Sequence, residues 1–226
     1  MKLSNETLNV LKNFSGINQG IEFKKGNKLT TVSSGKTVLA KATVKDDFPQ
    51  DFCVYDLNQF LSVHSMFKND VELDFDDSNI IFKGGRSKIN YRMTAKDMIV
   101  TPPDKTINVA NPDCEFTLSE VDLAEVLRAA SILSSPHIGV QSNGDKVNIV
   151  TFDANDNAQH TNSIEVADGD GKEYTIVFKT ENFKMIQGSY DVKITFKGLA
   201  HFKNIKEDIE YWIAFESKES KVPNGR

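Results

Sequence analysis

Short stretches in which apolar and polar residues alternate follow one another along almost the whole chain. They constrain the fold more than any other feature, because a period of two residues is typical of a strand that buries one face. Turn-forming residues separate many of them, as at 77–79, 84–85, 143–145 and 169–171, which is the pattern of antiparallel hairpins. The sequence therefore predicts largely antiparallel sheets. The expected strands are 17–25, 28–33, 36–44, 51–55, 71–75, 79–83, 87–93, 114–118, 137–142, 146–152, 162–167, 173–179, 189–197 and 208–216.

Four short segments with helical periodicity interrupt the strands. Ser4 is the expected N-cap of the first, and Thr117 with Glu120 forms a capping box before the third. The segments are Ser4–Phe14, Asp56–Phe67, Leu118–Leu133 and Thr180–Gln187. Their expected buried residues are Leu8, Leu11 and Phe14; Leu57, Phe60, Leu61 and His64; Val121, Ala124, Leu127 and Ala130; and Phe183 and Ile186.

A proline-containing stretch divides the chain into two similar halves. Pro102, Pro103 and Pro112 prevent a regular central strand or helix there. On both sides a strand, a cap and an amphipathic helix recur, in DFCVYDLNQFL and in CEFTLSEVDLAEVL. We therefore predict an α+β fold with two similar domains. The expected divisions are an N-terminal domain at 1–101, a connector at 102–112, a C-terminal domain at 113–217 and a disordered tail at 218–226.

The charge balance limits the kinds of partner. Lys and Arg number 27 against 32 Asp and Glu, which gives a formal charge of −5. A histone-like or ribosomal protein is therefore excluded, and any contact with nucleic acid must come from a local basic patch. The purely apolar runs, such as Tyr211–Phe215, are far shorter than the roughly 18 residues of a membrane span. The start lacks the continuous apolar region of a signal peptide, so we expect an intracellular protein without membrane contact.

No motif gives a positive reason to expect catalysis, a metal or a cofactor. Ser33–Thr37 resembles the end of a phosphate-binding loop, but Thr30 replaces its first glycine, so a hairpin turn is favoured. Asp168–Gly171 resembles a calcium loop, but Lys179 stands where its Glu is required, which favours a tight turn. The four histidines show no metal-ligand spacing. The two cysteines, Cys53 and Cys114, lie far apart in apolar stretches and are expected to be reduced and buried.

Six basic residues lie on or beside the helical segments, and two interpretations of them remain open. Cations late in a helix offset its dipole, which gives Lys12, Lys68 and Arg128 a local structural role. Alternatively, if the helices line one face of a symmetric ring, the bases form a positive track for phosphate groups. The six residues are Lys2, Lys12, Lys68, Arg128, Lys179 and Lys184.

Several segments together resemble one protein family. They are the opening MKLSNETLNVLKNFSGINQGI, then VYDLNQFL, FTLSEVDLAEVLR, ENFKM followed by GSY, and EYWIAFES. None is diagnostic alone, but in this order and spacing they resemble the sliding clamps of T4-type bacteriophages, which are DNA polymerase processivity factors. The resemblance runs from Met1 to about Ser217.

The resemblance implies a DNA-clamp fold, a homotrimeric ring with sheets outside and helices facing a central hole, and no catalytic activity. The implied partners are double-stranded DNA, the replicative DNA polymerase, the clamp-loader ATPase and a sigma-like factor of late transcription, in the cytoplasm of an infected bacterial host. Asn5 and Ser131 stand where some clamps carry further bases, which implies a shallower salt dependence. Bases that match positions kept toward DNA in similar clamps are Lys2, Lys12, Arg128 and Lys184.

Clamps of this general fold also bind a partner's short peptide in an apolar pocket between the connector and the C-terminal strand. By this resemblance the pocket residues are Ile99 and Val100 on one side and Ile213, Ala214 and Phe215 on the other. For Ile213 and Phe215, ordinary sheet core is the alternative, and Trp212 alternates to the opposite face, in the core or at the rim. Because one self-complementary patch cannot close a trimer, two different edges must meet, and strands 87–93 and 146–152 are the candidates.

Two other functions remain open. A monomeric two-domain binding or scaffold protein would contain the same strands but would neither self-associate nor encircle DNA. An enzyme with an unrecognised site would require carboxylates from distant strands to converge, which residue spacing alone does not reveal.

Overall fold

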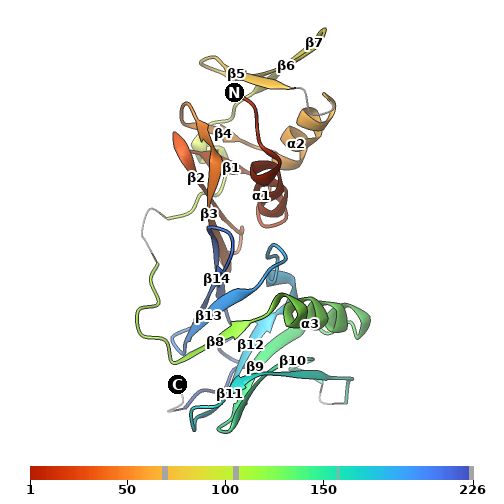
Figure 1. The fold of residues 1–226 in the computed structure, drawn as a ribbon, viewed down its shortest axis with the longest axis vertical. Helices are drawn as coiled ribbons and strands as arrows, with labels where there is room; N and C mark the ends of the chain where they lie inside the picture. The colour runs from red at the N-terminus through yellow and green to blue at the C-terminus, as the bar shows by residue number, and fades with distance from the viewer. Residues whose placement is uncertain (68–70, 104–106, 157, 224–226) are drawn as a thin grey trace. The chain divides into compact units, whose positions relative to one another are not determined.

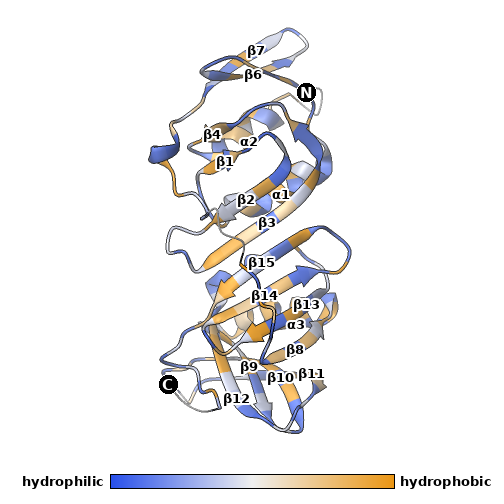
Figure 2. Ribbon diagram, turned by 90° about the vertical axis from the view of Figure 1, so that its left-hand side faces the viewer, coloured by the Kyte–Doolittle hydropathy of each residue, from blue (hydrophilic) through white to orange (hydrophobic). Residues whose placement is uncertain are grey.

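The structure, a computed structural model, describes residues 1–67, 71–103, 107–156 and 158–223. The chain divides into two compact units, residues 1–105 and 106–226, which we call unit 1 and unit 2 and describe separately (Figure 1). In both units hydrophobic residues concentrate in the strands, whereas many of the connecting loops are hydrophilic (Figure 2).

The described residues of unit 1 form two antiparallel sheets, with the strand orders β4-β1-β2-β3 and β5-β6-β7. Alternate residues of β3 from Val38 to Val44 are buried, as a period of two predicts. The strands are β1 (Ile21–Phe23), β2 (Gly26–Val32), β3 (Val38–Phe48), β4 (Phe52–Val54), β5 (Glu72–Phe75), β6 (Asn79–Gly84) and β7 (Ser87–Arg92).

Two helices of unit 1, α1 (Asn5–Ser15) and α2 (Leu57–Ser65), pack against each other, and α1 also packs against β3. Ser4 caps α1 as predicted, because its side chain accepts a hydrogen bond from the backbone of Thr7. Asp56 caps α2. The buried residues of the helices are Thr7, Val10, Leu11, Phe14, Leu57, Phe60 and His64. Leu8 and Leu61, predicted to be buried, keep part of their surface exposed.

Aromatic side chains form the core between α2 and the two sheets of unit 1. Phe23 of β1 stacks on Phe52 of β4, with ring centroids 4.4 Å apart, and lies 6.0 Å from Phe60 of α2. Phe60 in turn contacts Phe82 of β6 edge-on at 5.2 Å. This cluster fixes α2 against both sheets.

Unit 2 also contains two antiparallel sheets in its described residues, with the orders β8-β13-β14-β15 and β12-β9-β10-β11. The sequence does not predict β14. The strands are β8 (Cys114–Leu118), β9 (His137–Asn143), β10 (Lys146–Phe152), β11 (Asn162–Asp168), β12 (Glu173–Lys179), β13 (Tyr190–Thr195), β14 (Leu199–Asn204) and β15 (Ile209–Ala214).

The turn at 169–171 is not the hairpin turn that the sequence predicts, because β11 and β12 lie at opposite edges of their sheet. The loop instead crosses the turn between β9 and β10. There the backbone N–H of Gly169 donates to Asp145 at 2.7 Å, and that of Gly171 donates to Gly144 at 3.0 Å. A Cβ at Gly169 would lie 2.1 Å from the carbonyl oxygen of Gly144, so this crossing requires glycine.

The helix of unit 2, α3 (Glu120–Ile132), packs against β9, β10 and β11. Its N-cap is Ser119 rather than the predicted Thr117, since the Ser119 hydroxyl accepts a hydrogen bond from the backbone of Asp122 at 3.1 Å. The start of the helix is therefore shifted toward the C-terminus relative to the prediction.

The predicted buried face of α3 was wrong in part. Val121 is 72% exposed and Ala124 is not buried either, whereas Ala130 is buried as predicted. Leu123 and Val126 complete the true buried face. The helix carries apolar residues around most of its circumference, so the spacing alone does not identify the inward side.

The fourth predicted helix, residues 180–187, was also wrong, because only a single 3-10 turn, η2 (Thr180–Asn182), forms there. Phe183 is buried as predicted and packs edge-on against Phe178, with ring centroids 5.5 Å apart. Ile186 remains partly exposed, and its backbone N–H donates to the Tyr211 hydroxyl at 3.1 Å. Tertiary contacts therefore hold this segment in place of helical hydrogen bonds.

The segment that follows β15 lies along β12. Lys221 pairs with Thr175 of β12 through two backbone hydrogen bonds of 2.7 Å. Ser220 accepts a further hydrogen bond from the backbone of Val177 at 2.9 Å. Residues 216–221 therefore cover an edge of β12 that would otherwise expose unpaired backbone groups. Residues 224–226 of the predicted tail lie outside the described residues.

The other motif interpretations are resolved by the fold. Ser33–Thr37 joins β2 to β3 as a hairpin turn, as predicted. Cys53 and Cys114 are free and buried, also as predicted. The described residues contain no cluster of three or more potential metal ligands. None of the helices in this part of the chain is long and apolar enough to cross a membrane.

Candidate nucleic-acid interface

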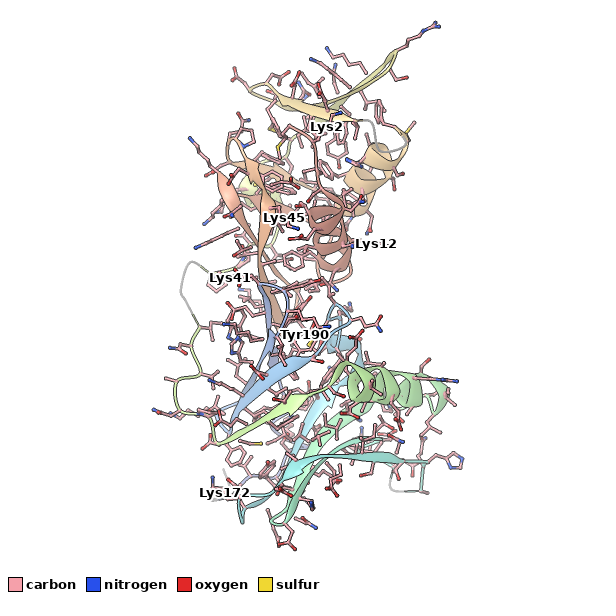
Figure 3. The ribbon with its side chains drawn as sticks, viewed as in Figure 1. Lys2, Lys12, Lys41, Lys45, Lys172 and Tyr190 are labelled. Atoms are coloured by element: carbon pink, nitrogen blue, oxygen red, sulfur yellow. The ribbon has the colours of Figure 1, made fainter. Side chains whose placement is uncertain are left out.

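Helix α1 presents one polar stripe to solvent. Asn5, Asn9 and Lys12 follow the spacing i, i+4, i+7, and none of the three is buried. Lys12 lies in the last turn, on the side of the helix away from β3 (Figure 3). Within the residues that the structure describes, its ammonium has no ion-pair partner. Lys12 is therefore available to an external anion.

Strand β3 holds the start of α1. Burial works against ionisation of Asp46, but hydrogen bonds from Thr7 and Ser4 outweigh it and lower the pKa of the Asp46 carboxyl. The bond from the Ser4 backbone is 2.7 Å long. The next residue, Lys45, forms an ion pair with Glu6 in the first turn of α1. Strand β3 thus orients α1 and also neutralises the one acidic residue of the helix.

Helix α2 presents a second polar stripe, and this one is uncharged. Its N-cap carboxylate, Asp56, accepts hydrogen bonds from the backbone of Gln59 at 2.9 Å and from the side chain of Gln19 at 3.0 Å. These bonds lower the pKa of Asp56 and keep it ionised at the positive end of the helix. The polar residues of α2 that keep exposed surface are Asn58, Gln59, Ser62 and Ser65.

Helix α3 of unit 2 has a different surface. Arg128 is not buried and has no ion-pair partner among the described residues. Its neighbours on the same side of the helix include Glu125 and Ile132, and the Ile132 side chain is 69% exposed. Glu120 and Asp122 lie in the first turn. With three acids against one base, α3 offers an anion a single cationic contact, Arg128.

The other four predicted bases lie in different environments. Lys179 ends β12, and its Nζ lies 4.0 Å from Glu216 of the C-terminal segment, which partly compensates its charge. Lys184 is exposed after η2, and Lys2 is exposed before α1. Lys68 lies outside the described residues. Lys179 is therefore less available to an external anion than Lys12 or Arg128.

Two residues predicted for a peptide pocket lie in unit 1, after the 3-10 turn η1 (Lys96–Met98). Ile99 packs so closely on Gly20 that a Cβ there would lie 2.6 Å from the Ile99 side chain. Val100 is 38% exposed, and its carbonyl accepts a hydrogen bond from the Asn18 side chain at 2.9 Å. Ile99 therefore anchors the segment, whereas Val100 keeps an accessible apolar side chain.

The three pocket residues predicted in unit 2 differ from one another. Ile213 has no exposed surface, and Phe215 is buried edge-on against Phe178, with ring centroids 6.1 Å apart. Both therefore belong to the sheet core, which was the alternative interpretation. Ala214 is partly exposed and lies opposite Leu199 of β14.

The sheet face of Ala214 also carries a cluster that the sequence does not predict. The rings of Trp212 and His201 stack with centroids 4.7 Å apart, and His201 Nε2 lies 2.8 Å from the Glu210 carboxylate. Burial lowers the pKa of His201, although Glu210 acts in the opposite direction. The register of β14 against β15 pairs His201 with Trp212, so recognising β14 would have revealed the cluster.

Two strands were predicted to lie at sheet edges. The strand β7 pairs only with β6 among the described residues, so it is an edge as predicted. The prediction for residues 146–152 was wrong, because β10 pairs with both β9 and β11. The edges of that sheet are β11 and β12.

Comparison with solved structures defines the fold as that of the DNA clamps. A structure of A. fulgidus PCNA matches 92% of this chain and 94% of its own length, with a TM-score of 0.67 and 14% sequence identity. Family models of the DNA polymerase processivity factor and of the C-terminal part of the gp45 sliding clamp match residues 4–101 and 115–217.

Two curated relatives extend the match along the chain. The sliding clamp of Vibrio phage KVP40 is 31% identical over 223 residues, which cover 96% of this chain and 100% of that protein. The sliding clamp of Enterobacteria phage T4 is 30% identical over 225 residues, which cover 96% and 97%. This chain therefore belongs to the phage sliding-clamp family, and it is a processivity clamp for DNA polymerase.

Proposed function

We propose that three copies of this chain form a closed ring around duplex DNA and that the ring tethers the replicative polymerase to its template. The observation that carries the proposal is the match to phage sliding clamps over 96% of the chain, which includes both units. The clamp acts by topology and contact, so the proposal requires no catalytic step.

The bases on the helices support contact with DNA independent of base sequence. A protein that slides must hold phosphates and must not read base edges. Lys12 and Arg128 suit this role, since each keeps exposed surface on a helix and has no ion-pair partner in the described part of the chain. Lys2 and Lys184 add positive charge, and Lys179 adds less because Glu216 lies near it.

For the ring itself, we propose that β7 of one subunit meets β11 of the next. A head-to-tail ring needs two different surfaces, one on each side of the subunit. Edge strands carry unpaired backbone N–H and C=O groups, and these can continue a sheet into a neighbouring chain. The edge positions of β7 and β11 in their own sheets support this assignment.

For partner recognition, we propose that the polymerase, the clamp-loader ATPase and a sigma-like late-transcription factor each present a short apolar peptide, in the cytoplasm of the infected host. The related A. fulgidus structure shows a clamp bound to the C-terminal region of FEN-1. Val100 in unit 1 is exposed and Ala214 in unit 2 is partly exposed, so each is a candidate contact.

Primer extension on a long circular template, with the polymerase, the loader, ATP and a polymerase trap, tests the tethering. We expect wild-type protein to lengthen products made in one binding event, and Lys12→Gln with Arg128→Gln to shorten them. Lys41→Gln is the matched control, because Lys41 alternates with buried Ala40 and Ala42 and so lies on the β3 face away from the core. If the double variant performs like the control, the DNA contacts are assigned wrongly.

The alternative is a monomeric two-domain scaffold. It predicts a mass of 25.3 kDa by light scattering at every concentration and product lengths unaffected by the protein. A mass near three times that value, together with longer products, excludes it.

A further inference from the structure

The two helices of unit 1 carry very little charge. Among the residues of α1 and α2, only Glu6 and Lys12 are a full acid or base, whereas 26% of the whole chain is charged. A helix face turned to water ordinarily carries many charged residues. The most exposed polar residues of the two helices are Asn5, Asn9, Lys12, Asn58, Gln59, Ser62 and Ser65.

The few acids near this surface are already engaged. Glu6 pairs with Lys45 of β3, and Asp56 accepts the hydrogen bonds of Gln59 and Gln19 as the N-cap of α2. Lys12 is therefore the one charged group on the two described helices without a partner there. The surface does not repel a polyanion and attracts it weakly.

The amide side chains of this surface are unused. Asn5, Asn9, Asn58 and Gln59 form no side-chain hydrogen bond within the described residues. Some asparagines elsewhere are engaged, as where Asn204 accepts from the backbone of Lys206 and Glu207, and where Asn18 donates to Val100. Each carboxamide offers two N–H donors, so the four residues present about eight neutral donors.

The serine hydroxyls of α2 are not free in the same way. Ser62 donates to the carbonyl of Asn58, and Ser65 donates to the carbonyl of Ser62, both at 2.8 Å. The amides, together with Lys12, are therefore the groups of this surface that can bind an external acceptor.

We propose that an amide face, defined as Asn5, Asn9, Lys12, Asn58 and Gln59, contacts the phosphate backbone of duplex DNA mainly through neutral amide donors. The inference rests on the proposed function and names the chemistry of its DNA contact. Neutral donors hold phosphate oxygens without replacing counterions, so they add affinity without steepening the salt dependence. Such a contact suits a clamp that must hold DNA loosely enough to slide.

Equilibrium binding to a short labelled duplex, followed by fluorescence anisotropy from low to moderate salt, tests the proposal. Asn9→Ala with Asn58→Ala should weaken binding by roughly fivefold for each amide hydrogen bond removed, at every salt concentration and with an unchanged slope. Asn9→Lys should steepen the slope of log affinity against log salt by about 0.9 for each new phosphate contact. Asn155→Ala, an exposed residue in the loop between β10 and β11, is the control.

The outcomes separate this inference from the proposed function. If the double alanine variant binds like wild type while Asn9→Lys binds more tightly, the face lies toward DNA but its amides do not hold phosphate, and the inference is wrong. It is also wrong if the alanine variants change the slope. If wild-type protein is not retained on nicked circular DNA after loading, the proposed function itself fails.

Discussion

Replacing Asp46 by Ala should loosen the helix that carries Lys12. The Asp46 carboxylate accepts a hydrogen bond of 2.7 Å from the Ser4 backbone and bonds the Thr7 hydroxyl. Losing a hydrogen bond to a charged group costs about 1.5–3 kcal/mol. Losing a negative charge beside a helix N-terminus costs about 0.3–1 kcal/mol more. We therefore expect the free energy of unfolding of unit 1 to fall by about 2–4 kcal/mol.

The effect should depend on pH in a defined direction. The pKa of Asp46 is lowered in the folded protein from its ordinary value of 3.8. The stabilisation is therefore complete above pH 3.8 and is lost as the pH falls through the lower pKa of the folded state. The difference between Asp46→Ala and wild type should accordingly be constant near neutral pH and shrink under strongly acidic conditions.

Urea unfolding followed by circular dichroism measures this effect, and the neighbouring residue supplies the control. Asp47 is exposed and makes no hydrogen bond or ion pair within the described residues, so Asp47→Ala should change the free energy of unfolding by less than about 0.5 kcal/mol. Equal destabilisation by the two variants would refute the role assigned to Asp46.

Three further predictions concern the stability of the fold and the association of its exposed edge. Gly169→Ala places a Cβ against the backbone of Gly144 and should lower the melting temperature by several degrees in differential scanning calorimetry, whereas Gly35→Ala, which meets nothing closer than 4.0 Å, should not. Burial lowers the pKa of His64, so the unfolded chain takes up a proton more readily than the folded one, and stability should fall as the pH drops below about 6.5. In His64→Leu, the urea midpoint should fall less steeply with decreasing pH than in wild type. An unchanged pH profile would contradict this role of His64. Truncation after Phe215 uncovers the edge of β12 and should produce concentration-dependent association in light scattering, which would be absent if residues 216–221 did not protect that edge.

The alternation of apolar and polar residues predicted most of the strands, because one face of each sheet is buried. The missed strand, β14, shows the limit of this signal. Its buried positions are Ala200, Phe202 and Asn204, and the partly exposed face holds Leu199 and His201, so its apolar and polar residues do not alternate clearly. Only the pairing with β13 and β15 defines it.

Helix α3 shows a second limit. Val121 and Leu123 are both apolar, and the spacing permits either side to face the sheet. Packing against β9, β10 and β11 buries Leu123 and leaves Val121 exposed. Information of this kind lies in contacts distant along the chain, which a local period does not contain.

Lys12 and Arg128 could be placed on helices from the sequence, but the surroundings of the basic residues could not be predicted. Both keep exposed surface. The compensation of Lys179 by Glu216 was not foreseeable, because it depends on the C-terminal segment lying along β12. The burial of Ile213, which was predicted to line the pocket, could not be predicted for the same reason, because it follows from the place of Ile213 within a packed sheet.

Retention on DNA of defined topology tests the central claim most directly. The protein is loaded onto a nicked circular plasmid, separated from free protein on a sizing column, and measured before and after a single restriction cut. We predict that the protein stays with the circle at moderate salt and leaves once the DNA is linear, because a closed ring can slide off only from an end. Equal retention before and after the cut, or none on the circle, would contradict the account of a ring around DNA.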